Sequence, residues 1–302
     1  MTHHLYLFTE LQTKLQANWR GLSDKPEETP ESTLRALWLA AAGRQVSAVS
    51  AQKHPLEPLL PSQQQVLLDL IEQRMSGIPL AYLTGRQHFM GLDLLVSAQA
   101  MIPRVETEIL ARAALDLLGE ISSQRAPSTV MDLCTGCGNI AVSLAVHHSG
   151  CKIYAADLSP EAILLARQNA DLHNLDGRIT FFTGDLFAPF EQETYYSRID
   201  LVTCNPPYIS SAQVASLPEE IRGYEPRLAF DGGAFGVSIF QRLVREAPRF
   251  LKPGGWLAFE VGAGQGDTLQ RYLLKHPAYL KVKSYADRSH TIRALAAQKK
   301  AN

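Results

Sequence analysis

The sequence contains no long hydrophobic run and no excess of charge of one sign. Nowhere do about 18 apolar residues follow one another, the length that a membrane-spanning helix needs. The first residues lack the basic stretch and the apolar stretch of a signal peptide. Lys and Arg total 29 and Asp and Glu total 30, for a net charge of -1. We therefore expect no membrane span, no signal peptide and no molecule-wide attraction to nucleic-acid phosphate.

Cysteine is scarce and unevenly placed. The four cysteines are Cys134, Cys137, Cys151 and Cys204, and none precedes residue 134. So few thiols in 302 residues indicate free cysteines in a reducing compartment, for which the cytoplasm is the default. Hydrophobic residues make up 46% and charged residues 20%, which excludes a disordered, collagen-like or disulfide-scaffold protein. The length predicts two domains, or one domain with an extension.

The first third of the chain is typical of helices. Thr29-Pro30 supplies an N-cap and a proline at the first helical position, and apolar residues then recur at helical spacing. Ser62 to Gln65 has the spacing of a capping box, and apolar pairs four residues apart follow it. We therefore expect a small all-α bundle over residues 1–85. Its acidic and basic residues nearly balance, which favours protein contact or packing over nucleic-acid binding.

The rest of the chain alternates between short apolar runs and helical patterns. A connector over residues 86–104 contains a short hairpin that includes Phe89, and a helix is expected from Thr107 to Leu118. Beyond Pro127, five runs have the length of strands: Thr129–Leu133, Lys152–Ala156, Ile179–Thr183, Ile199–Cys204 and Trp256–Val261. Helical stretches at residues 139–148, 159–173 and 237–250 separate several of them. This alternation predicts a parallel α/β sheet with helices on both faces.

A glycine-bearing turn follows the first of these strands. Asp132-Leu133 runs into Cys134-Thr135-Gly136-Cys137-Gly138 ahead of a predicted helix. Glycines permit close approach of a ligand, and the start of a helix offers free amide donors. Asp157 ends the next strand, where a carboxylate accepts the hydroxyls of a ribose. The pattern predicts a nucleotide-type cofactor site, but it also fits an NAD site or a tight structural turn.

Two cysteines of this loop have the spacing of a metal or redox pair. Cys134 and Cys137 are separated by two residues, but the sequence has no second pair of this kind. Both also stand where a cofactor loop needs small residues. We therefore favour a cofactor loop over a metal or redox site.

A short proline-rich loop follows the fourth predicted strand and reads Asn205-Pro206-Pro207-Tyr208. The prolines fix their own φ and stiffen the loop. Asn205 and the carbonyl of Pro206 offer two acceptors suited to a planar NH2 group, on which Tyr208 can stack. An NH2 conjugated to a carbonyl or a ring is a weak nucleophile, so holding it against a cationic electrophile lowers the barrier. The loop therefore predicts group transfer to such an amine or amide.

The glycine-bearing loop, Asp157 and the proline-rich loop together resemble class I S-adenosylmethionine-dependent methyltransferases that modify amino groups. Further segments resemble the HemK/PrmC family, the release factor glutamine methyltransferases. These segments are Ile78–Gly85, Ile102–Glu108, Tyr224–Gly233 and Leu251–Gly255, and the similarity covers about residues 30–295. The resemblance implies a Rossmann-like sheet preceded by a helical bundle.

The resemblance also implies how the parts of the chain are used. Residues 1–85 would recognise the substrate, residues 86–104 would connect, and residues 105–302 would bind S-adenosylmethionine and catalyse. The partner would be a peptide chain release factor, whose Gly-Gly-Gln tip enters the site and is methylated on the glutamine amide. We expect a cytoplasmic monomer without a metal.

Individual roles follow residue by residue from the resemblance. The cofactor would be bound by Asp132, Cys134, Thr135, Gly136, Cys137, Gly138, Asp157, Leu158, Asp185, Leu186 and Asn205. Within this set the loop would meet the methionine part, Asp157 the ribose, and Asp185 with Leu186 the adenine. Asn205, Pro206 and Tyr208 would be catalytic, and together with Pro207 they would hold the substrate.

The sequence departs from the family pattern at four positions. Cys134 replaces the usual glycine, and Cys137 replaces a threonine or serine. Val105 replaces the second proline of a Pro-Arg-Pro segment. Leu186 stands where an aromatic residue is frequent, which predicts weaker stacking on adenine.

Other polar residues have simpler interpretations. Glu106 and Glu108 fit either a helix start or a binding role. Glu225-Pro226 and Asp231-Gly232-Gly233 are expected to shape a lid or a turn. His147-His148 is expected at the surface, and the basic segment Lys281–Arg293 is expected to be a solvated face rather than an RNA contact.

Three alternatives to the main hypothesis remain open at this point. The same fold can methylate another protein or peptide amide, a small-molecule amine or an adenine amine in nucleic acid. The chain can instead be a non-catalytic binding module of the translation machinery. An NAD oxidoreductase is the third alternative, and it does not explain Asn205 to Tyr208.

Overall fold

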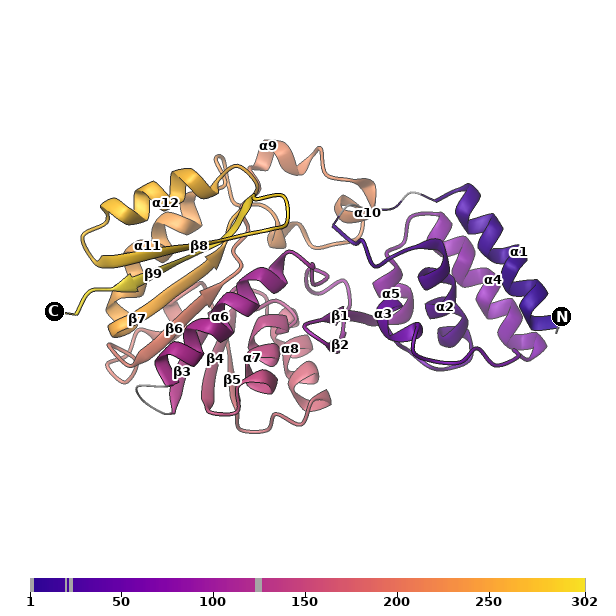
Figure 1. Ribbon diagram of the computed structural model, residues 1–302, viewed down its shortest axis with the longest axis horizontal. Coiled ribbons are helices and arrows are strands. Elements are labelled where there is room, and N and C mark those ends of the chain that lie inside the picture. Colours follow the sequence, from indigo (N-terminus) through magenta and orange to yellow (C-terminus); the bar gives the residue numbers. More distant parts are fainter. Residues whose placement is uncertain (1–2, 20, 22–23, 123–126, 302) are drawn as a thin grey trace. The chain divides into compact units, whose positions relative to one another are not determined.

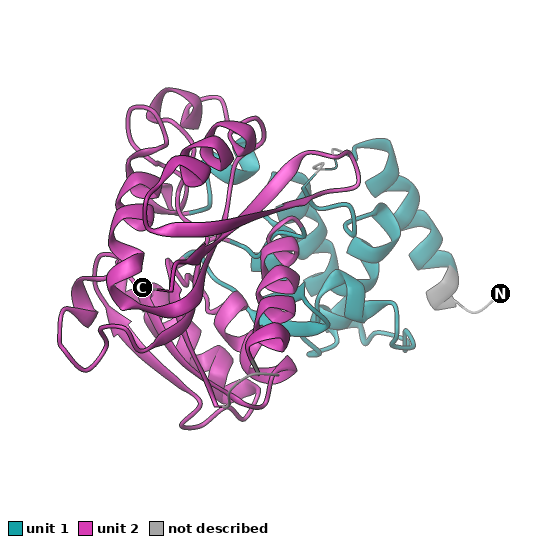
Figure 2. Ribbon diagram, turned by 60° about the vertical axis from the view of Figure 1, so that its left-hand side comes forward, with its two compact units in different colours: residues 1–98, 102–105, 218–225 teal, residues 99–101, 106–217, 226–302 magenta. Residues whose placement is uncertain are grey.

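The computed structural model describes residues 3–19, 21, 24–122 and 127–301 (Figure 1). The chain forms two compact units, which have different colours in Figure 2. Unit 1 contains residues 1–98, 102–105 and 218–225, and unit 2 contains residues 99–101, 106–217 and 226–302. The chain therefore passes from one unit to the other more than once.

Unit 1 is built mainly from helices. They are α1 (His3–Ala17), α2 (Pro30–Ala41), α3 (Ala48–Ala51), α4 (Pro61–Met75), α5 (Leu80–Thr84) and, from the later segment, α10 (Glu219–Arg222). The short hairpin expected in the connector is present as β1 (Arg86–Phe89) and β2 (Leu92–Leu95), which pair antiparallel. Trp38, Leu34 and Leu67 are almost completely buried in the core of the helices.

The N-cap predicted for α2 is confirmed, and the one predicted for α4 is wrong. Thr29 caps α2 as predicted, and its Oγ1 accepts a hydrogen bond from the backbone N–H of Ser32 at 3.1 Å. Ser62 does not cap α4, because the helix begins one residue earlier at Pro61. Proline fits this first helical position, where its missing N–H costs nothing. The side chain of Gln63 then accepts from the backbone N–H of Leu60 at 2.9 Å.

A cluster of buried charges holds the segment 218–225 inside unit 1. Glu220 accepts from the Nζ of Lys25 at 2.8 Å and from Arg74 at 2.9 Å. Arg74 also contacts Glu28, with 3.3 Å between Nη2 and Oε2. Because all four side chains are largely buried, loss of one partner leaves an uncompensated charge in the interior.

A second buried pair lies close to this segment in sequence. Glu225 pairs with Arg104, and its Oε2 accepts from the backbone N–H of Ile102 at 2.9 Å. Glu225 was expected to shape a lid or a turn, and the chain has a turn at Gly223 and Tyr224 followed by a bend at Glu225.

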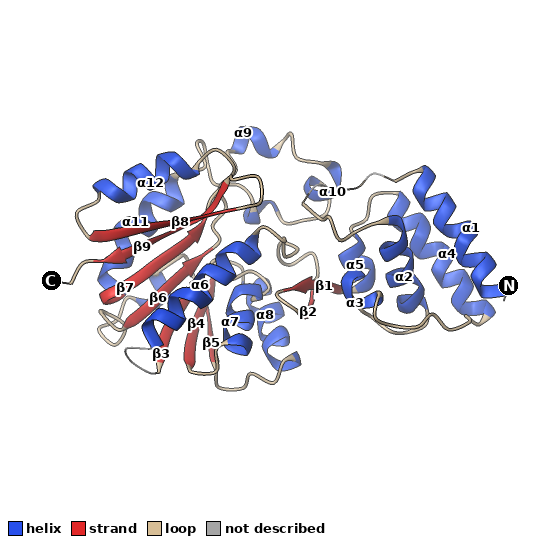
Figure 3. Cartoon of the chain, viewed as in Figure 1, coloured by secondary structure: helices blue, strands red, loops and turns tan. Residues whose placement is uncertain are grey.

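Unit 2 contains a mixed sheet in its described part (Figure 3). Its strands are β3 (Ser128–Leu133), β4 (Cys151–Asp157), β5 (Ile179–Thr183), β6 (Ile199–Cys204), β7 (Leu251–Glu260), β8 (Tyr279–Ala286) and β9 (Ile292–Lys299). Their order across the sheet is β5-β4-β3-β6-β7-β9-β8. The five predicted strands are present and parallel, so the α/β prediction is confirmed.

The expectation of a fully parallel sheet is wrong at one edge. β9 pairs antiparallel with β7 and with β8, and both strands were missed. The segment Lys281–Arg293 was interpreted as a solvated face, but most of it belongs to this hairpin. Polar residues alternate along the exposed edge strand β8, so it lacks the apolar run that marks a buried strand. Lys283 lies 4.9 Å from the centre of the Trp256 ring and pairs with Glu120.

The remaining helices connect the strands of the sheet. They are α6 (Thr107–Ser122), α7 (Asn139–His147), α8 (Pro160–Leu172), α9 (Ser211–Val214), α11 (Ser238–Phe250) and α12 (Gly266–Lys275), with short 3-10 turns at Ala188–Phe190 and Arg227–Ala229. The connections from β3 to β5 step one way across the sheet, and the connection from β6 to β7 steps the other way. Because such crossovers are right-handed, helices α7 and α8 lie on the face opposite to α11.

Successive strands are therefore added in opposite directions across the sheet on either side of the β3–β6 pair, which lies at its centre. Open α/β sheets bind ligands at this kind of reversal, beyond the carboxyl ends of the strands. Every residue of β6 is buried, so the centre of the sheet is also the centre of the core. Within the described residues, no helix has the length and apolar character needed to cross a bilayer.

Glu28 provides a test of the buried cluster in unit 1. Burial raises its pKa from 4.5 to about 7, against the opposing effect of Lys25 and Arg74. Between these two pH values the folded protein holds a proton that the unfolded chain releases, so the contribution of Glu28 to stability is largest below pH 4.5 and is lost as the pH rises to about 7. Glu28→Gln should flatten this part of the profile of unfolding midpoint against pH. The exposed Glu72→Gln is the matched control, and an unchanged slope in Glu28→Gln contradicts the prediction.

Candidate active site

Two loops of unit 2 lie at the point where the strand order reverses, between β3 and β6. Leu133 at the end of β3 pairs with Cys204 at the end of β6, so the residues that follow each strand emerge side by side. Residues 134–138 form the first loop, called here the cofactor loop. Asn205 to Tyr208 form the second, called here the amide loop. The structure thus brings together the two motifs on which the sequence interpretation depends.

Asp132, near the end of β3, holds the cofactor loop through buried hydrogen bonds. Its side chain is completely buried and accepts from the hydroxyl of Thr135 at 2.6 Å and from that of Thr203 at 2.7 Å. Burial raises the pKa of Asp132 to about 6, and these hydrogen bonds and one from the backbone of Ala141 lower it. Both carboxylate oxygens are therefore engaged within the fold.

The backbone of the cofactor loop is left-handed at three positions. The φ angles of Cys134, Gly136 and Gly138 are +54°, +55° and +83°. A side chain at Gly138 would also approach the Cβ of Ala166 to 3.1 Å, so glycine lets α7 pack against α8. Cys134 adopts a conformation that glycine adopts without strain.

The cysteines of this region are poor candidates for redox chemistry. Burial raises the pKa of the Cys137 thiol to about 12, which keeps the thiol protonated and unreactive. Burial raises the pKa of the Cys204 thiol as well, and Cys134 contacts it and adds to the effect. Cys134, Cys137 and Cys204 therefore serve as small side chains in the packing around the loop.

Asp157 joins the cofactor loop to the neighbouring strand. Its carboxylate accepts from the backbone N–H of Gly136 at 2.8 Å and from that of Ser159 at 2.9 Å. Its pKa is raised, because burial outweighs these hydrogen bonds. Leu158 is half exposed beside it.

The residues expected to meet adenine follow the next strand. The backbone N–H of Gly184 donates to the carbonyl of Asp157 at 2.8 Å, which holds the two strand ends together. Asp185 is exposed and pairs with Arg242 at 2.9 Å. Leu186 is buried in the core with a φ of +48°. Its side chain belongs to the core cluster of unit 2.

The amide loop is anchored by two side chains of unit 2. The Nδ2 of Asn205 donates to the Oγ1 of Thr107 at 3.3 Å, and the hydroxyl of Tyr208 donates to the Oε1 of Glu260 at 3.1 Å. Burial raises the pKa of Tyr208, and the charge of Glu260 raises it further. No described residue donates to the Oδ1 of Asn205 or to the carbonyl oxygen of Pro206. Asn205 is partly exposed and Pro206 is buried, so the hydrogen-bonding capacity of both oxygens is left unused by the described residues.

The backbone of the amide loop is held by its neighbours. The Nε2 of Gln265 donates to the carbonyl of Tyr208 at 3.1 Å, while its Oε1 accepts from the backbone N–H of Gly262 at 2.9 Å. A Cβ at Gly232 would lie 2.6 Å from the carbonyl oxygen of Pro207. Asp231 forms an isolated parallel bridge with Ile209, and the turn expected at Asp231 to Gly233 lies just beyond them, at Ala234 and Phe235.

Sequence reasoning missed the residues behind the amide loop. Thr107 is the first residue of α6, and Glu260 is the last residue of β7. An acidic residue at the end of an apolar strand was the available signal for Glu260. The charge of Glu106 raises the pKa of both Tyr208 and Glu260, so it lies near the site. Glu108 instead pairs with Arg112 one turn further along the helix.

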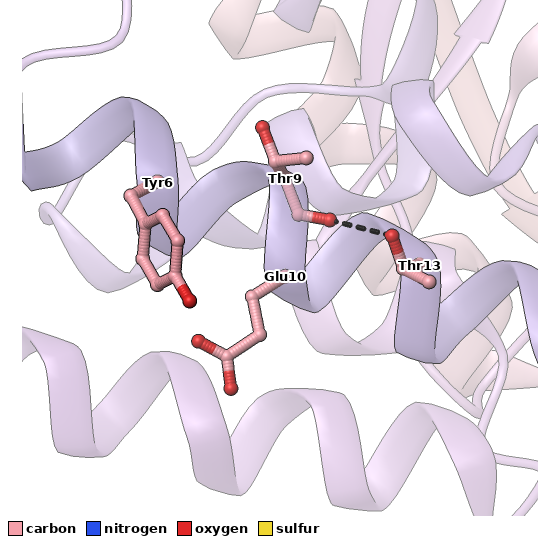
Figure 4. Close-up of a pocket in the computed structure, with 4 residues that line it drawn as sticks. All are labelled: Tyr6, Thr9, Glu10 and Thr13. Carbon is pink, nitrogen blue, oxygen red and sulfur yellow. Dashed lines mark hydrogen bonds between the residues drawn. The ribbon is translucent and has the colours of Figure 1, made fainter. Parts of the chain in front are cut away.

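Other features belong to other parts of the chain. His147 is exposed at the end of α7, and the part of the chain that the structure describes contains no cluster of three or more metal-ligating side chains. A pocket of about 340 Å³ lies on α1 in unit 1, lined by Tyr6, Thr9, Glu10 and Thr13 (Figure 4). None of the predicted site residues lines it.

Comparison with known proteins places this geometry in a family. The family described as "Methyltransferase domain" matches residues 125–285, and the family described as "PrmC N-terminal domain" matches residues 22–85. Among solved structures, the hMettl16 catalytic domain in complex with a MAT2A 3'UTR hairpin has a TM-score of 0.53 at 16% identity. It covers 76% of this chain and 81% of that one, and it shows a shared fold.

Curated relatives are more similar in sequence. A release factor glutamine methyltransferase of Geobacter sulfurreducens is 38% identical, over 78% of this chain and 79% of its own length. A ribosomal protein uL3 glutamine methyltransferase of Bradyrhizobium diazoefficiens is 39% identical, over 67% of this chain and 63% of its own length. The chain belongs to the HemK/PrmC family and is a methyltransferase.

Gly236 tests the packing behind the amide loop. Its φ is +65°, and a Cβ there would collide with the carbonyl oxygen of Tyr208. Gly236→Ala should reduce turnover at least about tenfold, because a shift of the loop misplaces its acceptors. Gly254→Ala is the matched control, since Gly254 has a φ of +75° but only one distant neighbour, at 3.9 Å. Both variants should lose some stability, but equal turnover in the two contradicts the prediction.

Proposed function

We propose that this protein transfers a methyl group from S-adenosylmethionine to the side-chain amide nitrogen of a glutamine in a peptide chain release factor. The observation that carries the proposal is the pair of open acceptors in the amide loop. The Oδ1 of Asn205 and the carbonyl of Pro206 match the two hydrogens of an amide NH2. Tyr208 supplies a ring on which the planar amide stacks. The names of both curated relatives support glutamine as the methylated residue, and the first of them supports a release factor as the substrate.

The cofactor loop and its surroundings fit S-adenosylmethionine. The left-handed backbone leaves room for a ligand, and the buried Asp132 holds the loop in place. Asp157 lies at the end of β4 with its carboxylate next to Gly136, where it would bind the ribose. The loop would meet the methionine part, and Leu158, Asp185 and Leu186 would surround the adenine. When bound, the cofactor supplies a methyl group on a positively charged sulfur.

The residues of the chain then act on the amide. Asn205 and Pro206 orient its nitrogen toward the methyl group, and Tyr208 with Pro207 restricts its plane. The C–N bond forms as the S–C bond breaks, and the nitrogen afterwards releases one proton. Because orientation and electrostatic stabilisation supply the rate, the transfer needs no covalent intermediate on the enzyme.

The helices of unit 1 are proposed to bind the body of the release factor, with the protein acting as a cytoplasmic monomer. The match of residues 22–85 to the N-terminal domain of the family supports this role. The named uL3 methyltransferase among the relatives makes ribosomal protein uL3 the second candidate substrate.

The deciding experiment is transfer of labelled methyl from S-adenosylmethionine to purified proteins. The substrates are a bacterial release factor, the same factor with the Gly-Gly-Gln glutamine replaced, and ribosomal protein uL3. Label on the first and not on the second supports the proposal. Label on uL3 alone assigns uL3 as the substrate. Absence of label on both the release factor and uL3 contradicts both candidate substrates.

Asn205→Ala tests the role of the amide loop. The variant should bind S-adenosylmethionine within roughly tenfold of the original protein, because the cofactor loop and Asp157 are unchanged. Its turnover should fall at least about a hundredfold, as expected for loss of a hydrogen bond that acts in the transition state. Isothermal titration and single-turnover assays measure the two effects, and thermal unfolding checks the fold. Near-normal turnover would falsify the mechanism.

A further inference from the structure

The orientation of the Asn205 amide decides whether the amide loop accepts or donates. If Oδ1 faces the substrate, the loop presents two acceptors to the NH2 group. If the amide is rotated by half a turn, its own NH2 faces the substrate and the pairing is lost. The two ends of an amide have nearly the same shape, so packing alone discriminates weakly between them. A specific hydrogen bond is therefore needed.

Thr107 supplies this hydrogen bond. Its side chain is completely buried at the start of α6, and its Oγ1 lies 3.3 Å from the Nδ2 of Asn205. A hydroxyl both donates and accepts, so it selects one end of the amide only if its proton is used elsewhere. Glu260 is the acceptor available to that proton: burial raises the pKa of its carboxyl, and a hydrogen bond from Thr107 acts in the opposite direction.

Glu260 connects the two ends of the amide loop. Its side chain is 2% exposed, and its Oε1 accepts from the hydroxyl of Tyr208 at 3.1 Å. Oε2 has no donor among the described residues, so the hydroxyls of Thr107 and Tyr208 are the partners that hold this buried acid. Burial raises the pKa of Glu260 and Glu106 adds to this effect, whereas Thr107, Arg293 and Tyr208 favour its charged form. In that charged form the carboxylate only accepts hydrogen bonds, which fixes the direction of both hydroxyls.

We propose that Thr107 and Glu260 are positioning residues that hold the Asn205 amide with its oxygen toward the substrate. The hydrogen bonds run from the NH2 of Asn205 to Thr107, and from the hydroxyls of Thr107 and Tyr208 to Glu260. One buried carboxylate thus sets the direction of the acceptor and the position of the stacking ring. The proposal rests on the proposed function, because it explains how the acceptor pair is kept ready for an NH2 group.

Thr107→Val tests the proposal, because valine keeps the shape of threonine and removes its hydroxyl. We expect kcat for methyl transfer to fall roughly tenfold, with a smaller change in the KM for the release factor and in the Kd for S-adenosylmethionine. Thr107→Ser should restore most of the lost kcat. Thr180→Val, on the exposed side of β5, is the matched control. An unchanged kcat in Thr107→Val, or no restoration by serine at an unchanged melting temperature, contradicts the proposal.

Glu260→Gln, alone and combined with Thr107→Val, gives a second test. If Thr107 and Glu260 act as one chain of hydrogen bonds, the double variant should be little slower than the slower single variant. Independent roles predict that the two losses multiply, and that result overturns the proposal.

NMR tests the hydrogen bond without any methyl transfer. The side-chain NH2 signals of Asn205, assigned by their loss in Asn205→Ala, should move in Thr107→Val and return in Thr107→Ser. Signals that stay in place contradict the proposal whatever the substrate is. If the original protein transfers no methyl to a release factor while these signals move as expected, the proposed function fails and the positioning network stands.

Discussion

The pairing of β3 with β6 is the constraint on which the candidate site depends. These strands are adjacent in the sheet but are separated in the chain by β4, β5 and two helices. Their parallel register sets Leu133 opposite Cys204, and each strand ends in a loop at the same edge. A slip of one residue would move each side chain of β6 to the opposite face of the sheet, and Thr203 would lose its hydrogen bond to Asp132. This buried polar contact favours the observed register, and the register determines the distance between the two motifs.

Each loop is supported by a buried carboxylate at the end of a strand. Asp132 binds the hydroxyls of Thr135 and Thr203 behind the cofactor loop, and Glu260 binds that of Tyr208 behind the amide loop. Burial raises the pKa of both acids, which is the cost of placing them in the interior. In return, a buried acceptor with few alternatives gives each loop one well-defined arrangement. The chemistry of the site thus depends on charges that the substrate need not touch.

What the sequence predicts well is local. β6 was predicted residue for residue, because most of its positions are apolar and the motif at Asn205 lies directly after it. β8 was missed because alternating lysines hide an edge strand from an apolar-run criterion, and β9 was missed because its buried residues are mostly alanines, which are depleted in strands. Thr107 and Glu260 were missed for another reason. Thr107 is 98 positions from Asn205, and Glu260 is 52 positions from Tyr208, so only the assembled sheet brings them together.

The chain that leaves the amide loop has an unusual course. It runs from Tyr208 through α9, contributes residues 218–225 to unit 1, and returns to place Gly232 against Pro207. Within unit 1 this segment is held by Glu220 and Glu225, each paired with buried cations. Removing one partner of such a pair is costly, whereas replacing the whole pair by apolar residues often is not. Ion pairs therefore fix where the segment lies more than they add to stability.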